Sequence, residues 1–483
     1  MINKGFIRNI KALKIIDDEQ IEKIYQDTLE VLESVGVRFE SERALKLFAD
    51  NGCKVDFKNR RVRIPSHIVE DCLRKCPSSI HLKARDPKNN LRIGGNIVYF
   101  GTFPGMRKVD LDTWEQKIPT LKDNDDAVKV LDALDYLHVS TSYTPYCEIK
   151  DVPPVMLLPV SCASRMKYFT KISRIGQGME SYIWEIKMAK VVGVDVFGAM
   201  ESSPPLTWHE DAINCAFACI EAGFPIEVGC ACVMGGTGPV TVAGSMITSN
   251  AEIMSGIVLV QLVKPGTGVI VNHFVFPQDM RGGFPVFGSI ESSLHRVVFN
   301  QFWRKYNFPI MNGSCAPSSS MTIDFQCGYE KGIGALLSAL SGANIVQLHG
   351  GIYGELTYHP VQSVLDDDIA GMIGRFTEGV EVNIETLALD LIEKVGPIPG
   401  FYLDKEHTRK WWKKEQFIPK VAVRLSYPEW IRKGKKNAID YAKEKVKEIL
   451  STYEPIPLPE EQSREIDKIL EEAKRYYAEK GML

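Results

Sequence analysis

The sequence predicts a closed (β/α)8 barrel, and two observations carry this prediction. Short apolar segments rich in β-branched and aromatic residues recur along the middle of the chain, and each is followed by a longer segment with helical periodicity. Eight such segments occur, separated by roughly 27 to 42 residues, which is the length of a whole strand–helix unit. An open doubly wound sheet is the alternative, but no candidate strand leads into a tight GxGxxG turn.

The candidate strands are 96–100, 137–143, 168–173, 195–200, 226–233, 268–274, 309–313 and 344–349. Helices are expected between them at 120–134, 181–192, 208–222, 240–263, 289–306 and 327–340. Residues 235–272 show one complete repeat, because a glycine-rich loop leads into a long apolar helix, a Lys-Pro-Gly stop and a buried strand. Such a loop, where a strand passes into a helix, is where α/β proteins bind ligands.

Helical additions are predicted on both sides of the barrel, which we assign to residues 91–360. Residues 1–90 are expected to pack on the barrel as a helical layer, with helices at 17–35, 41–50 and 65–75 and a short strand at 61–64. Asp17 or Asp18 is the expected N-cap of the first helix. Residues 361–483 form a helical extension, with helices at 366–376, 384–395, 428–453 and 463–480 and a proline-rich hinge at 455–459.

The bulk composition is that of an ordinary globular protein. The chain has 483 residues, 45% hydrophobic and 25% charged, with a net charge of −3, so no nucleic-acid or membrane partner is indicated. We find no signal peptide and no uninterrupted membrane-length apolar run, and we expect a cytoplasmic protein. The eleven cysteines are interpreted as buried reduced thiols. Because no Cys-x-x-Cys or His-x-Cys occurs, no metal site is predicted.

Aromatic residues gather at the predicted carboxyl ends of the strands, where barrel enzymes have their active sites. The candidate mouth residues are Tyr99, Phe100, Thr102, Phe103, Tyr143, Tyr146, His273, Phe274, Phe276, Asn312, Gly313, His349, Tyr353 and Tyr358. Such rings suit a cation that has no hydrogen-bond donors, such as a quaternary ammonium. His349 is either a donor to a substrate carboxylate or a core histidine. No carboxylate pair, Cys/His couple or Ser/His/Asp set stands out, so hydrolysis is not supported.

The glycine-rich loop 235–238 has two interpretations. It could hold a phosphate at the start of the 240–263 helix, or it could be a structural turn. The loop lacks the lysine of a P-loop, which favours the turn.

Several long blocks resemble the trimethylamine methyltransferase family. They are GGTGPVTVAGSMITSNAEIMSGIVLVQLVKPGTGVI, YEKGIGALLSALSGANIVQLHGGI, LDDDIAGMIGRFTEGVEVNIETLALDLIEKVGP and IYQDTLEVLESVGVRFESERALKLF, and the resemblance covers most of residues 20–430. It implies a TIM barrel that moves a methyl group from a methylated amine to the Co(I) corrinoid of a separate carrier protein. Trimethylamine enzymes of the family contain pyrrolysine. This chain has only standard residues and resembles the non-pyrrolysine branch, which includes glycine betaine:corrinoid methyltransferases.

The reaction implied by the resemblance explains why the predicted mouth lacks acid–base residues. A quaternary nitrogen leaves as a neutral tertiary amine, and Co(I) of the partner is the nucleophile, so the chain needs no catalytic nucleophile of its own. We therefore expect glycine betaine to be demethylated to dimethylglycine, with no tightly bound cofactor or metal and with a homo-oligomeric enzyme. The expected substrate-binding residues are Tyr99, Phe100, Phe103, Asn312, Gly313, His349 and Tyr353.

Two alternatives remain open. The substrate could be another quaternary amine, such as proline betaine, carnitine or γ-butyrobetaine. The barrel could also bind quaternary amines without turning them over.

Overall fold

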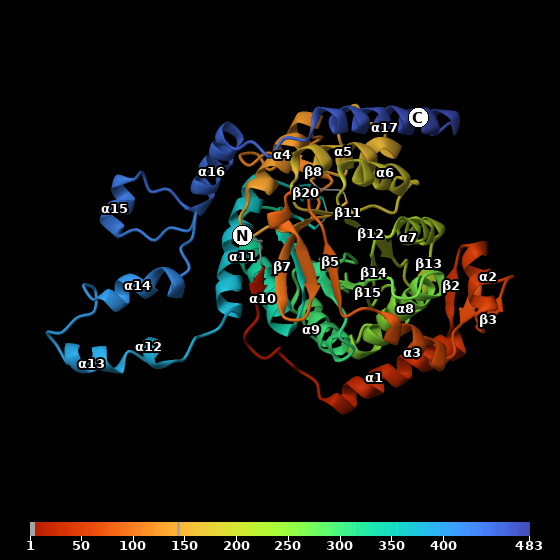
Figure 1. Cartoon of the computed structure of the whole chain (residues 1–483), viewed down its shortest axis with the longest axis horizontal. Coiled ribbons are helices and arrows are strands. Elements are labelled where there is room, and N and C mark those ends of the chain that lie inside the picture. Colours follow the sequence, from red (N-terminus) through yellow and green to blue (C-terminus); the bar gives the residue numbers. More distant parts are fainter. Residues whose placement is uncertain (1–4, 143–144, 316, 355) are drawn as a thin grey trace.

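The computed structural model describes residues 5–142, 145–315, 317–354 and 356–483 (Figure 1). Its centre is a barrel of eight parallel strands that closes where the last strand pairs with the first. In order around the barrel, the strands are β7 (Ile97–Thr102), β10 (Val139–Ser140), β11 (Ile172–Ile175), β12 (Val196–Glu201), β14 (Ile226–Cys230), β16 (Val269–His273), β18 (Ile310–Asn312) and β19 (Ile345–His349). Each overlaps a predicted strand, so the (β/α)8 prediction is confirmed.

A helix follows each barrel strand, as the fold requires. These helices are α4 (Leu121–Ala133), α5 (Leu157–Tyr168), α6 (Tyr182–Val192), α7 (Glu210–Ala222), α8 (Val242–Val263), α9 (Ile290–Lys305), α10 (Phe325–Ser341) and α11 (Pro360–Thr377). The sequence did not reveal α5, because Pro159 and several small polar residues obscure its periodicity. The loops that follow the barrel strands contain further short strands, which are β8 (Arg107–Val109), β9 (Gln116–Lys117), β15 (Val233–Met234), β17 (Phe276–Pro277) and β20 (Thr357–Tyr358).

The helix α8 is apolar on all sides because other elements cover it on all sides. It packs on β14 of the barrel, and α1 (Asp18–Glu30) and α3 (Ser66–Lys75) of the N-terminal layer cover its outer face. By length and composition α8 could cross a membrane, yet 78% of its apolar window is buried inside the protein. This is the pattern of a core helix in a globular protein.

The N-terminal layer has the predicted helices and strand. Asp17 caps α1, since its carboxylate accepts the Gln20 backbone N–H and Gln20 reciprocates in a capping box. A π-helical turn, Val31–Val35, ends this helix. Beyond it lie α2 (Glu42–Asp50) and a small sheet of β2 (Val37–Phe39), β3 (Lys54–Asp56), β4 (Arg61–Arg63) and β13 (Thr207–Trp208), while β1 (Phe6–Ile7) pairs antiparallel with β7.

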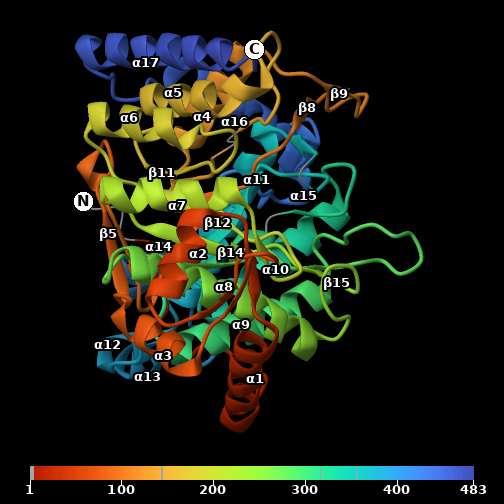
Figure 2. The same cartoon turned by 90° about the vertical axis from the view of Figure 1, so that its right-hand side faces the viewer.

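A β-hairpin closes the amino-terminal end of the barrel. It consists of β5 (Ser79–Leu82) and β6 (Leu91–Gly94) and lies opposite the loops at the carboxyl ends of the strands (Figure 2). One buried cluster joins the hairpin to the barrel interior and contains Ile80, Leu82, Leu91, Ile93, Tyr99, Val139, Ile172, Phe197, Ile270, Met311 and Ile345. This apolar layer fills the lower half of the barrel.

The C-terminal region is helical, but its helices are interrupted at positions that the sequence did not predict. Its helices are α12 (Ile384–Leu387), α13 (Leu389–Val395), α14 (Glu406–Glu415), α15 (Tyr427–Arg432), α16 (Ala438–Thr452) and α17 (Glu460–Glu479). The prediction of one helix over 428–453 is wrong, because Gly434 and Lys435 take positive φ and Asn437 caps a new helix. The helix α16 packs on α4 and α11, and α17 packs on α5 and α6. The segment between α11 and α16 extends away from the barrel (Figure 1).

Candidate functional site

A cavity of about 460 Å³ lies in the upper half of the barrel, at the carboxyl ends of the strands. Alternate residues of a strand point to the same side, so the inward positions above the apolar layer can be followed along each strand. The cavity is lined by Phe103, Pro104, Met106, Thr141, Ser142, Cys147, Arg174, Gly176, Gln177, Ala199, Glu201, Ala231, Asn272, Phe274 and Gln347. The cavity therefore combines an aromatic edge with charged and amide side chains.

Arg174, Glu201 and Glu227 form a charged cluster on three successive barrel strands. The guanidinium Nη2 of Arg174 donates to Glu201 Oε1 at 3.0 Å, and its Nε lies 3.2 Å from Glu227 Oε2. Gly229 makes room for this cluster, because a Cβ there would come within 2.1 Å of Glu201 Oε2. A glycine inside a strand commonly marks such a close approach.

Burial raises the pKa of Glu227 well above its ordinary value, and the neighbouring Glu201 raises it further while Arg174 opposes both. Burial therefore favours the neutral form of Glu227. With Glu227 neutral, the positive charge of Arg174 balances the negative charge of Glu201.

Amide side chains surround the cluster. Asn272 donates from Nδ2 to Glu201 Oε1 at 3.2 Å, and its Oδ1 accepts the backbone N–H of Gly313 at 3.0 Å. Gln177 accepts the backbone N–H of Glu201 through Oε1 at 2.8 Å. Within the described residues, the side-chain amide of Gln347 has no hydrogen-bond partner, and it faces the cavity. It is therefore available to a ligand.

Two phenylalanine rings form the aromatic edge of the cavity. Phe103 and Phe274 are stacked, with ring centroids 6.1 Å apart and an interplanar angle of 16°. Phe276 supports Phe274 from the side, with centroids 4.9 Å apart and the rings nearly perpendicular. The cavity therefore offers aromatic surface above and charged and amide groups below.

The predicted site residues are distributed over several environments. Phe103 lines the cavity, and Gly313 lies directly against it, since a Cβ there would come 2.8 Å from Gln347 Oε1. Tyr99 points into the barrel but lies in the apolar layer beneath the cavity, where its hydroxyl contacts the backbone of Arg92. Tyr353 is half-buried in a loop outside the lining. Tyr143 lies outside the described residues.

Phe100, Asn312 and His349 point outward, toward the helices. Phe100 belongs to the buried cluster between the barrel and α10 and α11. Asn312 exchanges amide hydrogen bonds of 2.9 Å with Asn300 of α9. His349 Nε2 lies 3.4 Å from a carboxylate oxygen of Asp367 on α11. These three residues lie at or near the ends of their strands, as predicted. Successive side chains of a strand point to opposite faces, however, and theirs point away from the cavity.

Sequence reasoning missed the charged and amide residues of the cavity. No carboxylate pair stands out in the sequence, but the pairing of β12 with β14 brings Glu201 and Glu227 together in the structure. A signal was present in the sequence for Glu227, Asn272 and Gln347, each of which interrupts or ends an apolar run of a strand segment. An isolated polar residue in a buried strand needs a partner or a function.

The glycine-rich loop 235–238 is a structural turn. The backbone N–H groups of Gly236, Thr237 and Gly238 all donate to the carbonyl of Val233, and that of Gly235 donates to the carbonyl of Gly238. Because these donors are used inside the loop, the turn interpretation fits and the phosphate interpretation does not.

Comparison with known proteins gives consistent matches over nearly the whole chain. Residues 2–477 match the family model described as Trimethylamine methyltransferase (MTTB). Glycine betaine methyltransferase of Desulfitobacterium hafniense (strain Y51) is 32% identical over 465 residues, covering 92% of this chain and 94% of that protein. Trimethylamine methyltransferase MttB of D. hafniense (strain DSM 10664 / DCB-2) is 29% identical over 472 residues, covering 95% and 94%. Among solved structures, Monomethylamine Methyltransferase (MtmB) of Methanosarcina barkeri aligns with a TM-score of 0.44 and 14% identity, covering 92% and 96%.

Proposed function

Because this chain belongs to the trimethylamine methyltransferase family, we propose that it transfers a methyl group from a quaternary amine to the Co(I) corrinoid of a separate carrier protein. The corrinoid supplies the nucleophile. The chain's own residues bind the amine, orient one N-methyl group and exclude water. The observation that carries the proposal is the cavity itself, which combines stacked phenylalanines with a largely buried cluster of one arginine and two glutamates.

The position of the cavity dictates how a substrate would lie in it. The methyl group has to face the open end of the barrel, because the hairpin and the apolar layer occupy the other end. The trimethylammonium group would then lie beside Phe103 and Phe274, whose ring faces attract a cation. The rest of the molecule would point down toward Arg174, Gln177 and Gln347.

Glycine betaine fits this orientation best. Its carboxylate needs hydrogen-bond donors at the lower end, and the amides of Gln347 and Gln177 can supply them. A neutral Glu227 would leave that end without excess negative charge. The substrate named for the relative with 32% identity agrees with this assignment.

The composition also supports a cytoplasmic enzyme. Nine of the eleven cysteines are buried as free thiols. Free thiols persist in the reducing environment of the cytoplasm. We further propose that no metal or organic cofactor is held tightly by the chain, since the acceptor arrives with its carrier.

The decisive experiment is a methyl-transfer assay with the purified full-length chain and free reduced cobalamin. Glycine betaine, proline betaine, carnitine, γ-butyrobetaine and trimethylamine are compared as donors. We expect methylcobalamin to appear in the visible spectrum together with dimethylglycine when glycine betaine is the donor. Binding of a quaternary amine by calorimetry, without methylcobalamin from free Co(I) or from a corrinoid carrier, would instead identify a binding protein.

A further inference from the structure

Residues 378–437 form an arm that leaves the body at the end of α11 and returns at the start of α16. Only Trp411 and Val421 are buried along its length. Many of its large apolar side chains are exposed, and several almost fully: Ile384 is 93% exposed, Ile398 94% and Leu403 85%. The others are Val380, Val382, Leu387, Leu389, Ile392, Phe401, Tyr402, Trp412, Ile418, Val423, Tyr427 and Ile431. A monomeric protein rarely exposes so much apolar surface in one place.

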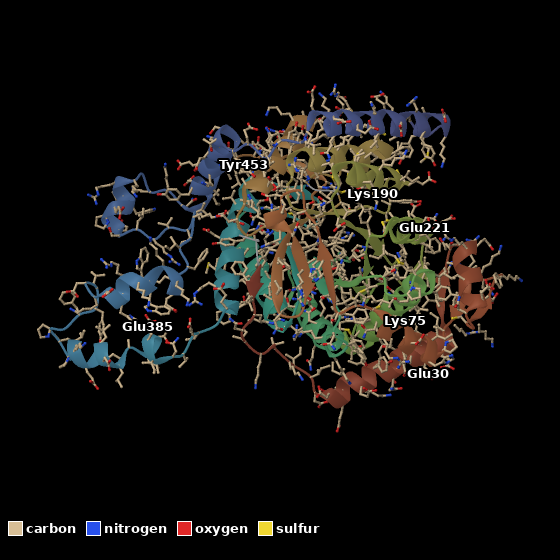
Figure 3. All side chains as sticks on the ribbon, in the orientation of Figure 1. Glu30, Lys75, Lys190, Glu221, Glu385 and Tyr453 are labelled. Carbon is tan, nitrogen blue, oxygen red and sulfur yellow. The ribbon has the colours of Figure 1, made fainter. Side chains whose placement is uncertain are left out.

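The arm is nevertheless a defined hairpin. Its outgoing part is tied to α14 on the returning part, because Lys410 pairs with Glu385 and Lys414 Nζ lies 2.6 Å from Glu381 Oε2. Arg375 of α11 holds the base through Glu415 at 2.9 Å. Glu385 lies well out from the barrel in Figure 3. The arm therefore has fixed structure without a core of its own.

The body carries a second exposed apolar surface near the base of the arm. Phe325, Tyr329 and Ile333 recur at every fourth position of α10 and therefore lie on one face of that helix. Met372 and Phe376 lie in the same way on the neighbouring helix α11, which leads directly into the arm. Phe325 is 85% exposed. We call these five residues the body stripe.

We propose that the arm of one copy packs on the body stripe of a second copy, and that the exchange is reciprocal. One chain carries both an apolar arm and an apolar face beside its root, which is the self-complementary arrangement that a two-fold interface needs. A foreign partner would require only one of the two surfaces. The second copy therefore accounts for both.

Charge favours the same occupant. Residues 404–436 hold eleven lysines and arginines against four acidic residues. Since the whole chain has a net charge of −3, the remainder carries an excess of ten acidic charges. The returning half of the arm therefore carries a charge opposite to the net charge of the rest of the chain, which favours its association with another copy.

Light scattering after gel filtration tests the proposal on the full-length chain. We expect a mass that is a multiple of 54.2 kDa. The double variants Ile384→Asp/Leu387→Asp on the arm and Phe325→Asp/Ile333→Asp on the stripe should each shift the protein to the monomer mass. The matched control is Phe57→Asp, an exposed apolar residue directly after β3, which should keep the wild-type mass. The strand β3 lies on the opposite side of the molecule from the arm in Figure 1. A monomeric wild type, or wild-type mass in either double variant with native circular dichroism, overturns the proposal.

Cross-linking between different copies provides a second test that does not depend on folding of the charged variants. Leu387→Cys and Ile333→Cys proteins are prepared separately, mixed and treated with a short bismaleimide. We expect a covalent heterodimer on a reducing gel. Leu387→Cys mixed with Phe57→Cys should give none beyond the wild-type background. Equal cross-linking in both mixtures would show that the arm does not select the stripe.

Discussion

Arg174 and Glu201 face each other across the neighbouring strands β11 and β12, with 3.0 Å between Nη2 and Oε1. Glu227 completes the cluster from β14. An arginine that faces two carboxylates is the only positive charge among the described lining residues of the cavity. Both the stability of the barrel and its charge toward a ligand depend on this residue.

Replacing Arg174 by methionine should leave the Glu201 carboxylate without its counter-charge, since Glu227 is neutral. Breaking a buried ion pair on one side typically costs about 3–5 kcal/mol, so we expect the free energy of unfolding to fall by about that much in urea titrations. The double variant Arg174→Met/Glu201→Gln should recover part of the loss, because it also removes the carboxylate charge that Arg174 balances. No recovery would mean that Arg174 acts by packing alone.

The pH dependence of methyl transfer should report on Glu227. Its pKa is raised, so the folded protein keeps this proton at a pH where the unfolded chain has lost it. Raising the pH through the folded pKa adds a negative charge near the proposed carboxylate position. We expect kcat/KM for glycine betaine to fall on the alkaline side, and the proton's contribution to stability to be lost over the same rise in pH.

Glu227→Gln mimics the protonated state and is the matched test of this pH effect. We expect near-wild-type kcat/KM at neutral pH and no alkaline fall attributable to this group. Choline, which carries no carboxylate, should not lose activity or affinity as Glu227 ionises. An unchanged alkaline fall in the variant would assign the effect to another group.

The aromatic edge should recognise the charge of the ammonium group and not only its shape. Phe274→Leu keeps apolar volume but removes a ring face, which is worth about 0.5–2 kcal/mol for a bound cation. We expect calorimetry to show weaker binding of glycine betaine, by roughly 2- to 30-fold. 3,3-Dimethylbutanoate, in which an uncharged tert-butyl group replaces the trimethylammonium group, should bind equally to both proteins. Equal losses for the two ligands would indicate simple packing.

Gly229 should be essential to the site but not to the fold. A methyl group there would collide with the carboxylate ends of Glu201 and Glu227, which are flexible and can move. Gly229→Ala should therefore fold with a similar melting temperature, while kcat/KM falls by about tenfold or more. A large fall in melting temperature with normal specific activity would contradict this assignment.

The barrel could be predicted from sequence because periodicity is a local property. Each strand overlaps its predicted segment, and the helix α8 was bounded to within two residues. The cavity could not be predicted in the same way. Glu201 and Glu227 belong to different repeats and meet only because β12 and β14 pair in one particular register.

The sequence also does not show which of the two faces of a strand a side chain occupies. Asn272 and Asn312 both lie at strand ends, yet Asn272 points into the cavity and Asn312 into the contact with α9. Their local sequences do not distinguish them. A side chain must also lie at the level of the cavity to line it. Tyr99 faces inward but lies in the apolar layer among Ile80, Ile172 and Phe197.

The hairpin formed by β5 and β6 has a kinetic consequence for the proposed reaction. It plugs the end of the barrel opposite the mouth, so a ligand in the cavity cannot reach solvent through that end. A carrier docked over that mouth would trap whatever the cavity holds. The amine would therefore have to enter before the carrier arrives, and the demethylated product could leave only after the carrier departs. Steady-state measurements should accordingly show a compulsory order, with the amine first on and its product last off.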